Sequence, residues 1–116
     1  MTVPLQEPTF LILAALAGEP AHGYGITQAV AAMSGNRVRL RPGTLYGALD
    51  RLTEQGLVEP EREEVVDGRL RRYYRLTDSG AALLTEEAQR LAGNAKAAMA
   101  GLRRRGRATK PRPANG

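Results

Sequence analysis

Apolar residues recur at helical spacing through the first half of the chain, and turn-forming residues separate the runs. Residues 9–17 are apolar on nearly every side and consist largely of leucine and alanine, which favour helix. Two further runs keep a spacing of four and three residues, which defines one face of a helix: Ile26, Val30 and Met33, and then Leu45, Leu49 and Leu52. The pattern predicts three short helices that bury their apolar faces together.

Beyond the third run the period changes from that of a helix to that of a strand. Two strand-like runs, residues 57–63 and 70–76, flank an Asp67-Gly68 pair, which in such a place is a strong hairpin signal. The face of the second run that we expect to be buried carries Leu70, Tyr74 and Leu76, with Arg72 interrupting it. Residues 37–41 alternate basic and apolar, which leaves a short strand and an extended linker both open.

The last predicted element is a long helix from the cap-like Thr77-Asp78 to about Leu102. Its leucine and alanine residues recur at alternating spacings of four and three: Leu84, Ala88, Leu91, Ala95, Ala98 and Leu102. Such a seam over nearly three heptads is longer than so small a domain can cover, and a partner helix is the usual solution. We therefore expect a homodimer whose interface contains Leu84, Ala88, Leu91, Ala95 and Leu102.

Three helices, a hairpin and a dimer-forming helix correspond to a winged helix-turn-helix fold, mostly α with a small β-hairpin. Residues 1–77 would form the DNA-binding domain, residues 78–102 the C-terminal dimerisation helix and residues 103–116 a disordered basic tail. In helix-turn-helix proteins the recognition helix lies in the major groove of DNA. Residues 43–55 would take that place here, with the hairpin as a wing on the flanking backbone.

Charge adds a second line of argument, through its position more than its amount. The 116 residues have a net charge of +5, but the last fourteen hold six of the 17 basic residues and no acid. The other 102 residues carry 11 bases and 12 acids, so the excess belongs to the tail, either a solvated extension or a non-specific phosphate-binding arm. Arginine, whose planar fork suits phosphate, precedes the recognition helix and lines the wing: Arg37, Arg39, Arg41, Arg69, Arg71, Arg72 and Arg75.

Composition disfavours several other classes of protein. The chain has no cysteine, no apolar stretch of bilayer length and no secretory signal pattern, so we expect a cytoplasmic protein without disulfides. The one histidine, His22, is expected to cap a helix, and no second ligand stands at metal spacing. No catalytic constellation or glycine-rich phosphate loop is present, so we expect neither a cofactor nor an enzyme. The pairs Glu63-Glu64 and Glu86-Glu87 are expected to be solvated.

Three blocks of residues follow one another along the chain. They are His22-Gly23-Tyr24, then Gly43-Thr44-Leu45-Tyr46 followed by Leu49, Arg51-Leu52 and Gln55-Gly56-Leu57-Val58, and finally the run from Gly68-Arg69 through Tyr73-Tyr74 to Thr77-Asp78-Ser79-Gly80. Together they resemble the PadR family of bacterial transcriptional regulators over residues 9–80. The single C-terminal helix is similar to that of the short members, which dimerise through it. Gly47 departs from the proline that is common in the family, and Thr53 from the glutamate.

We therefore expect a sequence-specific DNA-binding regulator that acts as a homodimer on a pseudo-palindromic operator, with repression implied by the resemblance. The residues expected to contact DNA are Tyr24, Arg41, Thr44, Tyr46, Arg51, Arg69 and Arg71. Packing is the alternative for Tyr24 and Tyr46, and pairing with Asp50 or Glu54 for Arg51. A small-molecule inducer of unknown identity is left open, although the last helix has no aromatic residue to clamp a planar drug as in some short members. The alternative function is a winged-helix protein–protein interaction module without specific DNA binding.

Overall fold

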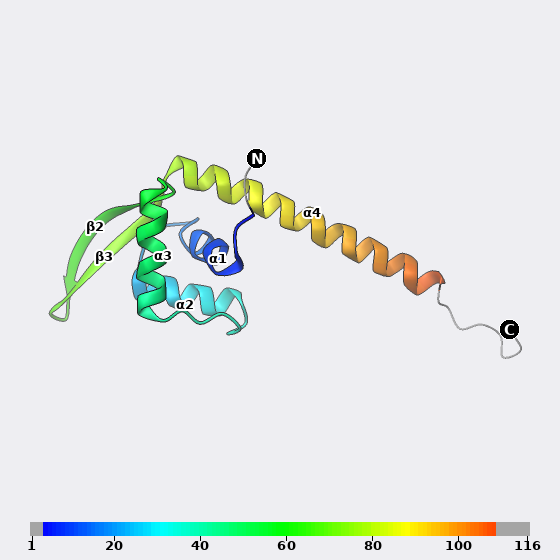
Figure 1. The fold of residues 1–116 in the computed structure, drawn as a ribbon. Helices are drawn as coiled ribbons and strands as arrows, with labels where there is room; N and C mark the ends of the chain where they lie inside the picture. Colours follow the sequence, from blue (N-terminus) through cyan, green and yellow to red (C-terminus); the bar gives the residue numbers. More distant parts are fainter. Residues whose placement is uncertain (1–3, 109–116) are drawn as a thin grey trace, which may run out of the picture.

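The computed structural model describes residues 4–108, and its elements follow the predicted order with one addition. In chain order they are α1 (Glu7–Ala15), β1 (Ala21–His22), α2 (Gly23–Met33), α3 (Pro42–Glu54), β2 (Val58–Val66), β3 (Arg69–Leu76) and α4 (Asp78–Ala108). The first three helices pack together, the β2–β3 wing projects from one side, and α4 runs away from them on the other (Figure 1). The predicted fold class, a mostly helical winged helix-turn-helix with a long C-terminal helix, is confirmed.

The core lies where the three helices meet the base of the wing. Its side chains are apolar and buried: Ile12, Leu13, Leu16, Ile26, Val30, Leu45, Ala48, Leu49, Leu52, Val58 and Tyr74. The predicted apolar faces of α2 and α3 are therefore correct, except that Met33 is exposed in the last turn of α2. α1 begins with Pro8 in its first turn, where the missing N–H of proline leaves no helical hydrogen bond unmade.

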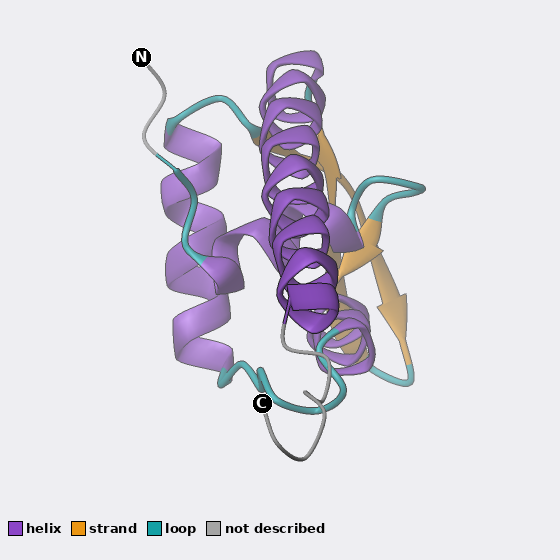
Figure 2. Ribbon diagram, turned by 90° about the vertical axis from the view of Figure 1, so that its right-hand side faces the viewer, coloured by secondary structure: helices purple, strands orange, loops and turns teal. Residues whose placement is uncertain are grey.

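The sheet has three antiparallel strands in the order β1-β3-β2, one strand more than predicted. Figure 2 shows the strands gathered on one side of the molecule. β1 pairs Ala21 with Tyr74 and His22 with Tyr73, and its two residues are too few to show an alternating pattern in the sequence. Residues 37–41 form no strand, so of the two alternatives the linker is correct.

The wing is a longer hairpin than predicted, and its outer half extends beyond the helices. Asp67 and Gly68 form its turn with φ values of 51° and 75°, the left-handed conformation that a tight, twisted hairpin requires. Leu70, expected in the core, is 61% exposed, and its cross-strand partner Val65 is exposed as well. That prediction was wrong because alternation identifies a face of the sheet, but not how far along the strand the covering helices reach.

α4 continues to Ala108, beyond its predicted end at Leu102. The residues that follow Leu102 are therefore helical where a disordered tail was expected: Arg103, Arg104, Arg105, Gly106 and Arg107. Arginine is a good helix former, and positive charge in the last turn is favourable beside the negative end of the helix dipole. Residues 109–116 of the predicted tail lie outside the described residues. None of the described helices has the length and apolarity needed to cross a bilayer.

The start of α4 is fixed to the base of the wing by close contacts that we call the 77–80 joint. The Thr77 hydroxyl accepts the Gly80 N–H at 3.0 Å and donates to the Gly56 carbonyl at 2.5 Å, so it caps α4 and ties it to the turn after α3. The Thr77 N–H donates to the Leu57 carbonyl at 3.1 Å. The same carbonyl lies against Gly80, where any Cβ would collide with it. Only glycine allows α4 to start this close to the wing.

Glu87 anchors the N-terminal segment on α4, contrary to the prediction that it is solvated. It is only 4% exposed, and its carboxylate accepts the Leu5 N–H at 2.9 Å and two N–H groups of Arg90 at 3.0 and 3.1 Å. The hydrogen bonds from Arg90 and then from Leu5 hold the pKa of Glu87 below its ordinary value. No local pattern could reveal this anchor, because Leu5 lies 82 residues away in the sequence.

Candidate nucleic-acid interface

The beginnings of α2 and α3 meet through a contact between a glycine and an aromatic ring. A Cβ on Gly23 would collide with the phenol of Tyr46, so any larger residue at this point of α2 would displace the ring from the place it has here. Tyr46 nevertheless keeps 47% of its surface exposed, and the neighbouring Tyr24 keeps 66%. Tyr46 therefore packs on α2, and both phenols remain accessible to a partner.

His22 lies immediately before α2 and caps that helix, as predicted. Its Nδ1 accepts the Gly25 N–H at 3.3 Å. Its ring meets Tyr73 of β3 edge-on with centroids 5.2 Å apart, and Tyr73 in turn lies 4.0 Å from the guanidinium of Arg62 and donates to Glu64 at 3.2 Å. These contacts link the wing to the start of α2. The part of the chain that the structure describes contains no group of three side chains that could hold a metal ion.

A groove of about 420 Å³ separates the wing from the beginnings of α2 and α3. It is lined by His22, Gly23, Tyr24, Tyr46, Arg69, Leu70, Arg71 and Arg72. Two tyrosines and two arginines that were predicted to contact DNA thus share one groove, although they come from three elements. Leu70 and Arg72 line it as well: Leu70 was expected to be buried, whereas Arg72 was expected to line the wing but was not among the predicted contacts.

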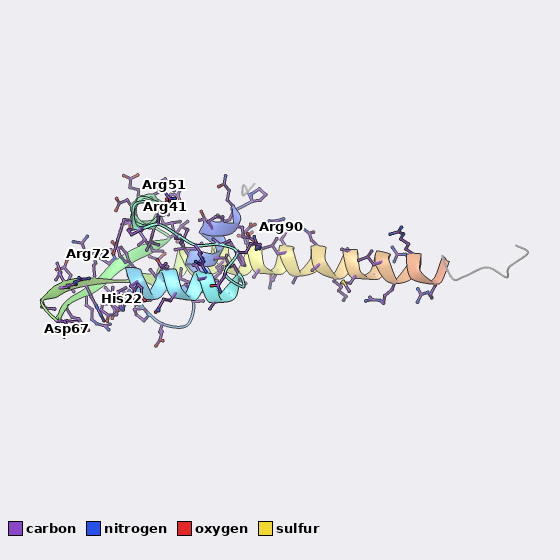
Figure 3. All side chains as sticks on the ribbon, turned by 90° about the horizontal axis from the view of Figure 1, so that it is seen from below. His22, Arg41, Arg51, Asp67, Arg72 and Arg90 are labelled. Carbon is purple, nitrogen blue, oxygen red and sulfur yellow. The ribbon has the colours of Figure 1, made fainter. Side chains whose placement is uncertain are left out.

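The other three predicted contacts lie at α3, outside this groove. Arg41 precedes the helix and makes no capping hydrogen bond through its side chain, Thr44 follows in the first turn, and Arg51 lies about two turns further on. All three are exposed. Figure 3 shows Arg41 and Arg51 at α3, well apart from His22 and Arg72. The candidate interface therefore has two parts, the exposed face of α3 and the groove beside the wing.

The ten arginines from Arg37 to Arg90 divide into those that have a carboxylate partner and those that do not. The pairs are Arg37 with Glu7, Arg62 with Glu61 and Glu64, Arg72 with Glu63, Arg75 with Glu59, and Arg90 with Glu87. Between residues 4 and 108, no ion pair or hydrogen bond engages the side chains of Arg39, Arg41, Arg51, Arg69 and Arg71. All four arginines predicted to contact DNA belong to the second group, so their N–H donors are available to a phosphate or a base.

The predicted dimer seam on α4 is covered by this chain only at its beginning. Leu84 packs partly against the core, whereas the later positions of the seam are exposed: Ala88, Leu91, Ala95 and Leu102. Leu91 borders a hollow of about 220 Å³ together with Leu5, Phe10 and Leu11. Beyond Leu84 the apolar stripe of α4 therefore has no cover within the described chain, and Phe10 and Leu11 of α1 beside it are only partly buried.

Comparison with known proteins shows which family the chain is similar to. The model of the transcriptional regulator PadR-like family matches residues 12–86. A transcriptional regulator of Mycobacterium tuberculosis, Rv3488, is 42% identical over 90 residues, which cover 78% of this chain and 80% of that relative. An uncharacterized 37.1 kDa protein from a transposon of Streptomyces fradiae is 48% identical over 86 residues, which cover 74% of this chain but only 23% of the transposon protein.

A solved structure of a relative includes DNA. Bacillus subtilis PadR in complex with operator DNA has a TM-score of 0.61 to this fold at 26% identity, over 70% of this chain and 46% of that chain. The matched family consists of transcriptional regulators, not enzymes. The sequence, the winged helix-turn-helix fold and these matches together show that the chain belongs to the PadR family of DNA-binding transcriptional regulators.

Proposed function

We propose that this protein represses transcription in the cytoplasm by binding a pseudo-palindromic operator, sequence-specifically and as a homodimer. One observation carries the proposal most directly. Arginines around α3 and at the outer end of the wing lack carboxylate partners, whereas arginines close to them in the sequence, Arg37, Arg72 and Arg75, have them. Guanidinium groups without such partners can donate to DNA without first breaking an ion pair.

The arrangement suits the docking of a winged helix on duplex DNA. A recognition helix occupies the major groove, and the exposed face of α3 would enter it from Thr44 onward. The groove beside the wing would then receive the adjoining backbone, with the hydroxyls of Tyr24 and Tyr46 and the forks of Arg69 and Arg71 as donors to phosphate. The Bacillus PadR structure with operator DNA supports DNA as the partner.

A second copy of this chain is the proposed partner for the apolar stripe of α4. The stripe has coiled-coil spacing and stays uncovered beyond Leu84. A two-fold symmetric dimer presents two recognition helices related by the same symmetry. Its operator should therefore have two half-sites about one helical turn apart, roughly 34–36 Å, or a multiple of that distance.

Fluorescence anisotropy with the DNA upstream of the gene tests the proposal. We expect the affinity for that duplex to exceed the affinity for a shuffled duplex of the same composition by about 10³-fold or more at physiological salt. A duplex with one arm of the inverted repeat scrambled is the matched control and should lose most of the difference. Equal affinity for native and shuffled duplexes would rule out sequence-specific binding, and a rise in transcription from that promoter in vitro would rule out repression.

A winged-helix protein–protein interaction module is the second candidate. It is favoured by the charge of the first 102 residues, which carry 11 bases and 12 acids and so give little general attraction to DNA. In that case a protein partner should co-purify with the chain, and the anisotropy experiment should show no preference for the native duplex.

A further inference from the structure

The face of α3 that points away from the core carries two glycines. The buried stripe of the helix consists of Leu45, Ala48, Leu49 and Leu52. At 3.6 residues per turn, the positions opposite this stripe are Gly43, Gly47, Asp50 and Glu54. The centre of the exposed face is therefore without side chains over its first two turns, and nothing lies within 4 Å of the place that a Cβ of Gly43 would take.

Arg51 occupies the gap that Gly47 leaves. A Cβ built on Gly47 would lie 3.6 Å from Nη1 of Arg51, so the guanidinium reaches back along the helix over the glycine. A side chain longer than a methyl group at this position would compete for the same place. Within the described residues Arg51 pairs with neither Asp50 beside it nor Glu54 three residues on, although pairing was the expected alternative to DNA contact.

We infer that Arg51, seated over Gly47, is the residue through which α3 recognises a guanine of the operator, an inference that rests on the proposed function. The fork of arginine donates two parallel hydrogen bonds to O6 and N7 of guanine, the commonest specific contact in the major groove. The carboxylates of Asp50 and Glu54 on the same side of α3 repel phosphate, so this part of the helix suits base edges better than the backbone. Gly47 is then a positioning residue, because its lack of a side chain leaves the space that the guanidinium of Arg51 occupies.

Arg51→Lys separates a base contact from a phosphate contact, because lysine keeps the charge and loses the fork. We expect operator affinity to fall about 5- to 150-fold, while the affinity for a shuffled duplex and the salt dependence of binding stay at their wild-type values. Substituting each base pair of the half-site in turn should reveal one position where the wild-type protein prefers guanine and the variant does not. Wild-type operator affinity in Arg51→Lys would overturn the inference. So would an equal loss on all duplexes with a shallower salt slope in Arg51→Ala, which is the signature of a phosphate contact.

Two substitutions of Gly47 test whether the open space above this residue is needed to position the Arg51 guanidinium. Gly47→Ala adds a methyl group at ordinary contact distance from the guanidinium, so the guanine preference should survive. Gly47→Leu fills the space above residue 47 and should abolish the preference for guanine, as Arg51→Lys does. Alanine and leucine both favour helix, and the thermal transition of each variant checks that it is folded. An unchanged guanine preference in folded Gly47→Leu would contradict the inference.

The wild-type protein distinguishes a failure of this inference from a failure of the proposed function. If it binds its own operator no better than a shuffled duplex, the proposed function and the inference fail together. If it discriminates and Arg51→Lys discriminates equally well, only the inference fails.

Discussion

Arg69 and Arg71 lie at the outer end of β3 without a carboxylate partner, whereas Arg72 and Arg75 on the same strand are each bonded to a glutamate of β2. Arginines on the same strand thus differ in whether a carboxylate already neutralises their positive charge or leaves it available to DNA. The sequence identifies all four as basic wing residues but cannot separate the two kinds. Register alone does not decide the pairing, because Arg71 lies opposite Glu64 just as Arg72 lies opposite Glu63, but Glu64 is engaged by Arg62 and Tyr73 instead.

Replacing Arg69 and Arg71 together by alanine should weaken binding to every DNA sequence. Each lost phosphate contact removes about 0.9 from the slope of log K against log salt, so we expect the slope to flatten by up to about two. The double variant Arg37→Ala with Arg75→Ala is the matched control, because it loses the same charge from arginines that are already paired. Anisotropy titrations at several salt concentrations measure both slopes. If the two variants flatten the slope equally, net charge is responsible and the wing does not contact the DNA.

The 77–80 joint is the place where one element depends most on the backbone of another. Gly80→Ala would force a Cβ against the Leu57 carbonyl, and we expect this to destabilise the protein by about 1–3 kcal/mol, as overpacking generally does. Gly93→Ala on the same helix is the control. Nothing lies within 4 Å of its added methyl group, so it should stabilise the protein by about 0.5–1 kcal/mol. Chemical denaturation measures both free energies, and shifts of the same sign would contradict the packing argument.

The anchor between the N-terminal segment and α4 should give the stability a specific pH dependence. Because Arg90 and Leu5 lower the pKa of Glu87 in the folded state, the anchor contributes stability above the unfolded-state pKa, near the ordinary value of 4.5. That contribution is lost as the pH falls through the lower, folded-state pKa. We expect Glu87→Gln to lower the Tm at pH 7 and the difference from wild type to shrink below pH 4.5.

Glu86→Gln is the matched control for the anchor, since Glu86 is adjacent and exposed. Its Tm should follow that of the wild-type protein over the whole pH range. A Glu87→Gln variant that is as stable as wild type at pH 7 would show that the N-terminal segment does not depend on this carboxylate.

Most of the elements could be predicted from the sequence, because each has a local pattern of its own, either a periodic spacing of apolar residues or a turn-forming pair. The leucines of α3 and the Asp67-Gly68 turn are examples. β1 could not be predicted, because its two residues are ordered by pairing with β3, which lies far along the chain. The end of α4 was placed too early, since a run of arginines is compatible with a solvated tail and with a helix terminus alike. Leu70 was misplaced because the reach of the helices over the wing is a tertiary property.

For the whole molecule, the uncovered stripe of α4 predicts that a single charge should prevent dimerisation. Ala95→Glu places a carboxylate in the seam, and we expect a monomer by light scattering at micromolar concentration. Operator affinity should fall about 100-fold or more, because the two half-sites are no longer bound together. Ala97→Glu makes the same change away from the seam, at another exposed position of α4, and should remain dimeric. A dimeric Ala95→Glu would exclude this stripe as the interface.

The close packing of Gly80 on the Leu57 carbonyl also has a geometric consequence for operator choice. α4 has 31 residues and is therefore about 46 Å long, and it acts as a lever arm pivoted at the base of the wing. A tilt of about 5° at the pivot would move its far end by about 4 Å, an appreciable fraction of the distance between half-sites. In the proposed dimer, the spacing of the operator would therefore depend on one glycine and one threonine at the pivot as well as on the residues that touch the bases.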